Sequence, residues 1–439
     1  LPATPAQHPV THTQLGRALK RLVMDAQDHF GARSTSLRAV ITVPAYFGVA
    51  EKEATYAAAR IAGIDCLELL AEPVAAVYAY GVEKAGDGGS LVFDLGGGTF
   101  DVAVVGMADR RPRIWAVDGE TRLGGLDWDQ RMFDLLWERL VTQGIDEGAE
   151  FDEDFAAALS TEAELLKRNL SVREAGKVRI RYDGRMYTVS VTRSAFEEAT
   201  SDLVIMCIEA AKRVLATARE LGARSVERVL LVGGSTRMPM IRAALEAGLG
   251  LPVIIHDPDK AVARGAAVLA SMVGASKGAG QYRSAGILGP KTVAPVLPKA
   301  IGIKLYSSSL PVRPEPYVCC IIPQNTLLPV VKKRVTVATA LSKQSKARIE
   351  LYEQAGVIVS DEIEGNRLLF DGEVTGIASA PAGSPIHLDV SVSIEGRIEV
   401  EAVDGSTGKT LRVDAFIHGV VDEGELAEQT DNVSGLMVL

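Results

Sequence analysis

The feature that most limits the fold of this 439-residue chain is a change of hydrophobic pattern after about Val273. Before it, short β-branched stretches such as RAVITVP, RYDGRMYTVSV and ERVLLVGG alternate with helical stretches, of which one covers residues 194–221. After Pro298, period-2 stretches such as ARIELYE and IHLDVSVSI follow one another, separated by turn sequences. Strands that alternate with helices form layered α/β structures, whereas consecutive short strands form sandwiches. The sequence therefore predicts an α/β domain followed by an all-β sandwich.

A stretch rich in Gly, Ala, Ser and Pro separates the two halves. It runs from about Gly274 to Pro298 and has the composition of a linker. At roughly 100–200 residues per domain, a chain of this length has room for several domains. We predict an α/β domain over residues 1–275, a linker over 276–298, a β-sandwich over 299–420 and a tail over 421–439.

Charge and cysteine content argue against several classes of protein. A net charge of −9 disfavours a general nucleic-acid binder, because neutralising phosphates requires clustered Lys and Arg. The 4 cysteines form no Cys/His array at metal spacing, so neither a zinc site nor a disulfide framework is expected. No uncharged apolar stretch approaches the roughly 18 residues that span a bilayer, and residues 1–15 lack the pattern of a secretory signal. We expect a cytoplasmic protein that binds neither nucleic acid nor membrane.

The stretch SLVFDLGGGTFDVAVV predicts a β-hairpin whose turn is Gly96–Gly98, with Asp94 before it and Thr99 and Asp101 after it. Three glycines let the backbone adopt positive φ and approach a ligand closely, so that N–H groups cradle phosphate oxygens. A carboxylate on each arm suits a hydrated Mg²⁺, which is usually bound by one or two carboxylates and the phosphates of the substrate. The hairpin therefore predicts a site for Mg²⁺ and a phosphate chain.

Two more glycine pairs follow predicted strands. Gly233-Gly234 ends RVLLVGGSTRMP and leads into a helix, whose first N–H groups can bind an anion or adenosine, while Arg237 can stack on a base. Gly124-Gly125 precedes a helix that starts near Trp128. Each pair alone is also compatible with a simple tight loop, but three such turns in one α/β region favour a nucleotide cleft. Walker A and GxGxxG motifs are absent, which disfavours a P-loop or Rossmann domain.

One predicted helix carries polar residues along a single face. Within EAELLKRNLS, this face holds Glu164, Lys167, Arg168 and Ser171, at i, i+3, i+4 and i+7. Spacing alone favours a solvated face with a Glu164–Arg168 pair over a binding site.

Seven stretches occur in one order across the first 275 residues: VPAYF, AEPVAAVYAYG, FDLGGGTFDV, LGGLDWD, LLKRNLS, VLLVGGSTRMP and DPDKAVARGAAV. Together they resemble the seventy-kilodalton heat-shock chaperones of the DnaK type, and NTLLP, LYE, GIASAPAGSP and VDGSTGK continue the resemblance through the β half. The resemblance implies an actin-like, ribonuclease H-like ATPase joined to a β-sandwich that grips extended segments of unfolded polypeptides. It also implies ATP or ADP with Mg²⁺ as ligands, and a J-domain co-chaperone and a nucleotide exchange factor as partners.

The resemblance further implies roles for individual residues. Asp94 and Asp101 match carboxylates that hold Mg²⁺ through water, and with Thr99 and Glu72 they form the implied catalytic set. Phosphate contacts are implied for Gly97, Gly98 and Thr99. Adenosine contacts are implied for Glu164, Lys167, Arg168 and Ser171 on one wall, which reverses the solvated-face interpretation, and for Gly233, Gly234, Ser235 and Arg237 on the other, with Asp259 nearby. Glu72 also matches, with Pro44, Lys52 and Pro73, a relay that carries the nucleotide state to the linker.

Some family features have no counterpart in the chain. The family's first phosphate loop and its catalytic lysine lie upstream of VPAYF, and residues 1–39 contain neither. GILGPKTVAPVLP replaces the leucine-rich linker, and no helical lid follows the β half. We therefore expect an N-terminally incomplete ATP-dependent chaperone. The alternatives are a peptide-binding scaffold with a vestigial, non-hydrolysing nucleotide domain and a metabolite kinase of the actin-like superfamily, although a kinase would not explain the β half.

Overall fold

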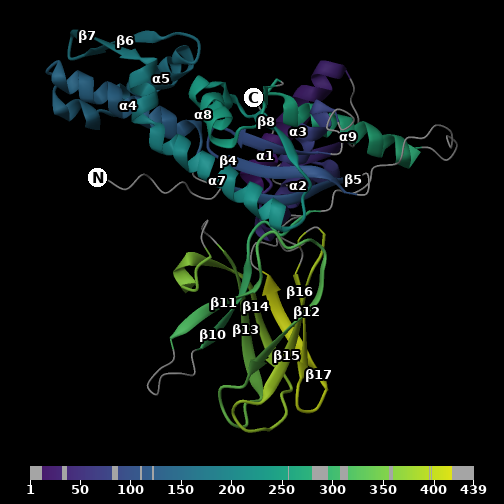
Figure 1. Cartoon of the computed structure of the whole chain (residues 1–439). Helices are drawn as coiled ribbons and strands as arrows, with labels where there is room; N and C mark the ends of the chain where they lie inside the picture. Colours follow the sequence, from purple (N-terminus) through teal and green to yellow (C-terminus); the bar gives the residue numbers. More distant parts are fainter. Residues whose placement is uncertain are drawn as a thin grey trace. The chain divides into compact units, whose positions relative to one another are not determined.

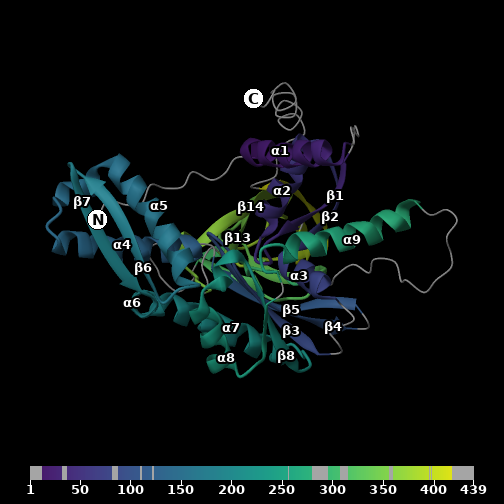
Figure 2. The same ribbon diagram turned by 90° about the horizontal axis from the view of Figure 1, so that it is seen from above.

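The structure, a computed structural model, describes most of the chain as two compact units. One unit is Glu72–Gly265, and the other combines Leu1–Ala71 with Ala266–Leu439 (Figures 1 and 2). The predicted linker lies largely outside the described residues, so the predicted domain boundaries stay a prediction. The described residues are 12–31, 37–81, 88–108, 111–120, 123–255, 257–278, 295–306, 315–354, 359–394, 396 and 398–417.

A five-stranded mixed sheet forms the centre of the Glu72–Gly265 unit. Its order is β5-β4-β3-β8-β9, in which β3, β4 and β5 are antiparallel, while β8 runs parallel to both β3 and β9. The strands are β3 (Gly89–Leu95), β4 (Phe100–Ala108), β5 (Arg111–Glu120), β8 (Val226–Val232) and β9 (Val253–Ile255).

Helices cover both faces of this sheet, which explains why its strands are almost continuously apolar. Along β8, Val229 and Leu231 join the core packed under α7 (Ser201–Glu220). Leu230 and Val232 point to the other face, where they line a small cavity with residues of α3 (Glu72–Tyr80). The face of the sheet that α3 covers is the one that carries the site described below.

The other elements of this unit form a helical arm and the connections of the sheet. In the arm, Asp152 accepts hydrogen bonds from the backbone N–H groups of Asp154 and Phe155, both at 3.1 Å, and so caps α5. These elements are α4 (Gly125–Thr142), η1 (Glu147–Phe151), α5 (Glu153–Leu170), β6 (Ala175–Tyr182), β7 (Arg185–Thr192), α6 (Arg193–Ala199), η2 (Gly234–Arg237), α8 (Pro239–Leu249) and α9 (Ala261–Gly278), which continues into the other unit.

Two sequence predictions in this unit were wrong in detail. The helix predicted over residues 194–221 is divided at Thr200, whose φ is −120° and whose buried hydroxyl donates to Phe196 O at 2.8 Å. RYDGRMYTVSV, predicted as one strand, spans the β6–β7 hairpin. Asp183 and Gly184 form its turn with φ of 45° and 72°, as a two-residue hairpin loop requires.

The second unit contains a small parallel sheet of β1 (Leu37–Val43) and β2 (Ile64–Ala71). Two helices, α1 (His12–Phe30) and α2 (Val49–Ile61), pack on it through Val23 and Ala59. Among the described residues, no helix has both the length and the apolar character needed to cross a membrane.

Beyond residue 295, the described chain forms one eight-stranded antiparallel sheet, in agreement with the period-2 pattern. Its order is β11-β10-β13-β14-β17-β16-β15-β12, and its buried side chains share a single apolar core. The strands are β10 (Ile301–Tyr306), β11 (Pro316–Ile322), β12 (Val330–Ala338), β13 (Lys346–Gln354), β14 (Asn366–Thr375), β15 (Pro385–Val392), β16 (Ile398–Asp404) and β17 (Thr410–Ile417), with η3 (Ile363–Gly365) before β14.

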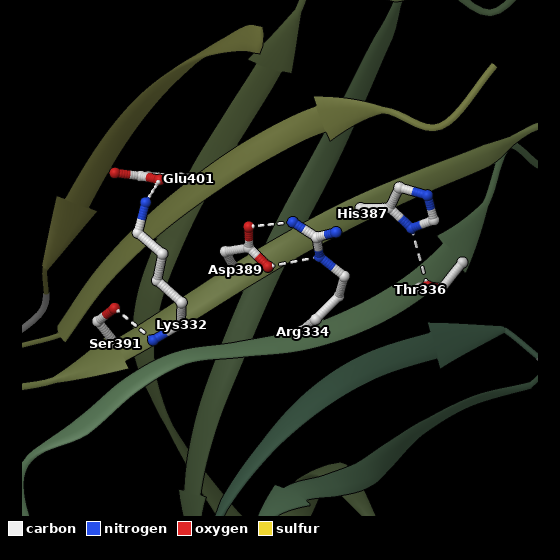
Figure 3. A network of polar contacts seen from close by, with 7 residues as sticks. All are labelled: Lys332, Arg334, Thr336, His387, Asp389, Ser391 and Glu401. Carbon is white, nitrogen blue, oxygen red and sulfur yellow. Dashed lines mark hydrogen bonds and ion pairs between the residues drawn. The ribbon is translucent and has the colours of Figure 1, made fainter. Parts of the chain in front are cut away.

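One face of β12, β15 and β16 carries a ladder of polar pairs (Figure 3). Arg334 lies opposite Asp389 and donates to both of its carboxylate oxygens, at 2.8 and 2.7 Å. Lys332 pairs with Glu401 at 2.8 Å, and the Thr336 hydroxyl lies 2.9 Å from His387 Nδ1. Asp389 and Glu401 on this face each have a cation beside them.

Candidate functional site

The two carboxylates of the glycine hairpin lie side by side. Asp94 on β3 and Asp101 on β4 are direct partners across the antiparallel pair, so their side chains project from the same face of the sheet. Asp94 alternates with Val92 and lies beside Val232 of β8, whose side chain faces α3. Asp101 is only 3% exposed, and Asp94 is partly buried. The pair therefore projects into the space between the sheet and α3.

Glu72, the first residue of α3, adds a third acid to this region. The pKa of Glu72 is raised to about 7, mainly by burial and also by the charge of the nearby Asp94. Burial also raises the pKa of Asp94 to about 6. In the described part of the chain, no cation forms an ion pair with either of these two side chains. Two adjacent buried carboxyl groups without a counter-ion create a strong preference for a bound cation.

A direct metal site of three or more ligands is not present among the described residues. Asp94 and Asp101 are compatible with a cation that keeps its water shell and reaches them through water, which is the usual behaviour of Mg²⁺. This agrees with the water-mediated role predicted for Asp94 and Asp101, which stays a prediction.

The hairpin turn is fixed by its carbonyl groups. Gly96 O accepts from Gly125 N at 2.9 Å and from the Ser235 hydroxyl at 2.8 Å, and Gly97 O accepts from Leu126 N at 2.7 Å. In a planar trans peptide the N–H points opposite to the C=O. The N–H groups of Gly97 and Gly98 are therefore directed away from α4, and neither donates to another described residue. This leaves two adjacent donors open to an anion.

The sequence predicts two reasons for the glycines of the turn: positive φ and the close approach of a ligand. None of Gly96, Gly97 and Gly98 has a positive φ, so that part of the prediction was wrong. A Cβ on Gly97 would meet no protein atom within 4 Å, and both Gly97 and Gly98 are exposed. By contrast, a Cβ on Gly124 would lie 2.6 Å from the backbone of Gly98. Packing within the protein therefore requires glycine at position 124. At Gly97 and Gly98, a closely bound ligand would require glycine.

The turn after β8 closes the same region from the other side. Gly233 has a φ of +85°, and a Cβ there would overlap Leu95 O and lie 2.7 Å from Asp94 Oδ1. Gly234 starts η2, and Arg237 at its end forms an ion pair with Asp259. Arg237 lowers the pKa of Asp259 through this hydrogen bond, and the charge of Arg168 on α5 contributes to the same lowering. The predicted adenosine walls on α5 and η2 thus lie close enough to interact electrostatically.

The predicted face of α5 divides into exposed and buried members. Arg168 is 72% exposed and pairs with Glu164 at 3.4 Å, while Ser171 ends the helix with its hydroxyl 3.3 Å from Lys167 O. Lys167 is buried and contacts α4. All the predicted ligand-binding and catalytic residues lie in the Glu72–Gly265 unit. Of the predicted relay, Glu72 and Pro73 start α3, whereas Pro44 and Lys52 belong to the other unit.

Comparison with known proteins identifies the family. A family model described as Hsp70 protein matches residues 10–429. The chain belongs to the Hsp70 family. It is 35% identical over 402 residues to heat shock 70 kDa protein BIP3 of Oryza sativa subsp. japonica, which covers 90% of this chain and 56% of the relative. Over 402 residues it is also 35% identical to chaperone protein DnaK of Thermosipho melanesiensis, covering 89% of this chain and 63% of that protein. The chain therefore spans between 56% and 63% of the length of these Hsp70 relatives.

In this Hsp70 chain, Gly125 anchors the hairpin turn, Gly124 packs against its tip, and Asp129 holds Lys167. All three belong to LGGLDWD, in which the sequence indicated the glycine pair as one of three turns of a nucleotide cleft but did not single out Asp129. The spacing of Gly125 and Asp129, four residues apart at a helix start, is the signal that would have placed them on one face.

Proposed function

We propose that this Hsp70 chain carries an actin-like nucleotide-binding region and a substrate-gripping β-sandwich, and that ATP binding and hydrolysis control its binding of unfolded polypeptides. The observation that carries the proposal is the pairing of Asp94 and Asp101 beside a turn with two open N–H donors. Acids that favour a cation and donors that favour an anion, a few residues apart, match the two halves of a magnesium–phosphate ligand.

The triphosphate would lie along the hairpin tip. Gly97 and Gly98 would donate their N–H groups to phosphate oxygens, and the Thr99 hydroxyl would add a third donor next to them. Asp94 and Asp101 would hold the waters of Mg²⁺. When bound, Mg²⁺ neutralises charge that develops on the transferred phosphoryl group.

Adenosine would lie between α5 and η2. The exposed guanidinium groups of Arg168 and Arg237 supply flat cationic surfaces suited to the two faces of a purine. Glu164, Lys167, Ser171 and Ser235 supply hydrogen-bonding groups for the sugar and base, and Gly233 and Gly234 allow the close approach of the turn. Asp259 holds Arg237 in place through their ion pair.

Hydrolysis needs a water oriented toward the terminal phosphate. Glu72 has a pKa of about 7, so near neutral pH its carboxyl group exchanges a proton readily and can orient and deprotonate such a water. We assign this role to Glu72 because it is the acid beside Asp94 that is contributed by another element. The further assignments, a J-domain co-chaperone, a nucleotide exchange factor and a cytoplasmic location, follow from the family resemblance alone.

Calorimetry and turnover measurements on the protein in its full natural length test this proposal. We expect heat of binding with Mg-ADP, and ATP hydrolysis that an unfolded peptide stimulates. Asp183→Asn, in the exposed β6–β7 turn where Asn also tolerates positive φ, is the matched control for substitutions of the site acids. Absence of adenine-nucleotide binding would contradict the proposal. Peptide binding that is indifferent to nucleotide would support the scaffold alternative instead.

A further inference from the structure

A cavity of about 200 Å³ lies where α7 and α8 end. Its walls come from the last turns of these two helices, from Leu251 just after α8, and from residues 223–226, which lead into β8. Among the described residues that line it, none belongs to the candidate nucleotide site. The cavity is therefore a separate feature of the Glu72–Gly265 unit.

The walls of the cavity are mostly apolar and only partly covered by the protein. Leu215, Ala223 and Val226 pack against the core of the unit and stay partly exposed, as do Leu249 and Leu251. Water that contacts such walls finds few hydrogen-bond partners, so an apolar group of a ligand replaces it favourably. The walls therefore favour a small alkyl or aromatic group.

The polar side chains of the lining are hydrogen-bond donors. They belong to Arg219, Arg224 and Ser225. A guanidinium group can only donate hydrogen bonds, and a serine hydroxyl can donate one. Within the part of the chain that the structure describes, neither guanidinium group forms an ion pair or a hydrogen bond. Two unpaired cations thus share one cavity.

Other arginines on the same two helices have acidic partners within the protein. Arg213, earlier in α7, pairs with Asp118 at 2.8 Å, and Arg242 of α8 pairs with Glu246 at 2.8 Å. These pairs lie on the surface and need no ligand. The two arginines of the cavity differ because their charges are left for a bound group.

The negative end of α7 does not cancel this preference for an anion. Its last carbonyl groups are already used, since Ala218 O accepts from Ala223 N at 2.9 Å and Arg219 O accepts from Gly222 N at 3.0 Å. The helix dipole favours a cation at Arg219, but it does not account for Arg224, which lies beyond the end of the helix. The charged groups that the cavity offers to a ligand are two guanidinium groups, which favour an anion.

We propose that this cavity binds a small organic acid that carries one carboxylate on an apolar body. The carboxylate would lie between Arg219 and Arg224, because a guanidinium group presents its N–H donors in a planar fork that matches a carboxylate. The apolar body would pack against Leu215, Leu249 and Leu251. The inference does not depend on the proposed nucleotide-binding function.

Calorimetry on the protein in its full natural length tests the inference with three probes: hexanoate, hexan-1-ol and inorganic phosphate. We expect saturable binding of hexanoate with a Kd below about 1 mM. Hexan-1-ol lacks the charge and phosphate lacks the apolar body, so each should bind at least about tenfold more weakly.

Substitutions assign the binding heat to this cavity. Arg219→Gln and Arg224→Gln should each weaken hexanoate binding about tenfold, the loss of one charge-assisted contact. Ala223→Leu fills the cavity without changing its charge and should abolish hexanoate binding. Arg181→Gln, at an exposed position of β6, and Ala216→Leu, at an exposed position of α7, are the matched controls and should leave it unchanged.

The absence of saturable hexanoate binding would overturn the inference, as would wild-type affinity in both arginine variants. Equal affinity for hexanoate and hexan-1-ol, or for hexanoate and phosphate, would show that only one half of the ligand is recognised and would also overturn it. If Ala223→Leu does not fold, judged by circular dichroism, a variant that combines Arg219→Gln with Arg224→Gln replaces it. Retention of hexanoate binding by that double variant would overturn the inference.

Discussion

The acidic side chains of the candidate site and those of the eight-stranded sheet lie in opposite electrostatic environments. On the sheet, Asp389 accepts two hydrogen bonds from Arg334, which lower the pKa of Asp389, and Lys332 forms an ion pair with Glu401 at 2.8 Å (Figure 3). In the site, burial raises the pKa of Asp94 and Glu72, and no described cation is paired with either. Acidic side chains that serve only the fold have a cationic partner within the protein. A buried acidic side chain without such a partner indicates a position where a bound ligand supplies the cation.

Removing the charge of Asp94 should have the largest effect. If the unpaired acids exist to hold hydrated Mg²⁺, Asp94→Asn should reduce kcat/KM for ATP at least about 100-fold, since electrostatic stabilisation of phosphoryl transfer depends on the metal. Steady-state hydrolysis at fixed Mg²⁺ measures this, with Asp183→Asn as the control. If Asp94→Asn hydrolyses ATP within a few-fold of the wild-type rate, the unpaired acid of the site is not needed for hydrolysis. The proposed difference between the acids of the site and those of the sheet would then be wrong.

Adding a side chain at Gly233, beside Asp94, should destabilise the fold. Gly233→Ala places a Cβ against Leu95 O at a φ of +85°, and we expect a loss of about 2–3 kcal/mol in the free energy of unfolding. Gly184→Ala is the control, because its φ of +72° is similar but its Cβ would meet nothing within 4 Å. A control loss of about 1 kcal/mol is expected from backbone strain alone. Equal losses in the two variants would mean that the approach of Gly233 to β3 is not tight.

The two groups of acids should give stability opposite dependences on pH. The folded state binds protons at Glu72 and Asp94 more tightly than the unfolded state, so their contribution falls as the pH rises from about 4 to about 7. Asp389 has a lowered pKa, so its contribution is present above its ordinary pKa and is lost as the pH falls through the lowered one. We expect Asp94→Asn to stabilise the α/β unit at pH 8 by on the order of 1–2 kcal/mol and to have little effect at pH 4.

Tryptophan fluorescence during denaturation isolates this effect. All 3 tryptophans, at positions 115, 128 and 137, lie in the Glu72–Gly265 unit, so their signal reports on that unit alone. A variant that is less stable than the wild type at pH 8, or equally stabilised at pH 4, would contradict the assignment of a raised pKa to Asp94.

The smallest effect is expected on the sheet. Lys332→Met removes the cation of an exposed ion pair, since Lys332 and Glu401 are each 59% exposed, and exposed ion pairs contribute little because water and salt screen them. We expect Tm to change by no more than about 1–2 °C and nucleotide binding to stay the same. Scanning calorimetry at low and high salt measures the difference. A large decrease in Tm would contradict this expectation. It would show that the ion-paired acids of the sheet are as important for stability as the unpaired acids of the site are for ligand binding.

Sequence reasoning found the elements of the site because they are local. The glycine hairpin, its flanking acids and the strand-end turn at Gly233 are each contiguous in the chain, and the observed register places Asp94 opposite Asp101 as a hairpin with this turn requires. The division at Thr200 was missed because helical periodicity continues through it, and only the tertiary contact with Met240 and the bond to Phe196 mark the break. The role of Asp129 was missed for a similar reason: its partner is on another helix, which spacing within one helix cannot show.

The anchoring of the hairpin turn on α4 has a mechanical consequence. Two successive carbonyl groups of the turn are tied to the first two N–H groups of the helix, so a pivot of α4 about its amino end must drag the loop with it. Because α5 packs against α4, the two helices would move together. A protein that displaced their far ends would shift the turn, and with it the site proposed for phosphates, without touching that site.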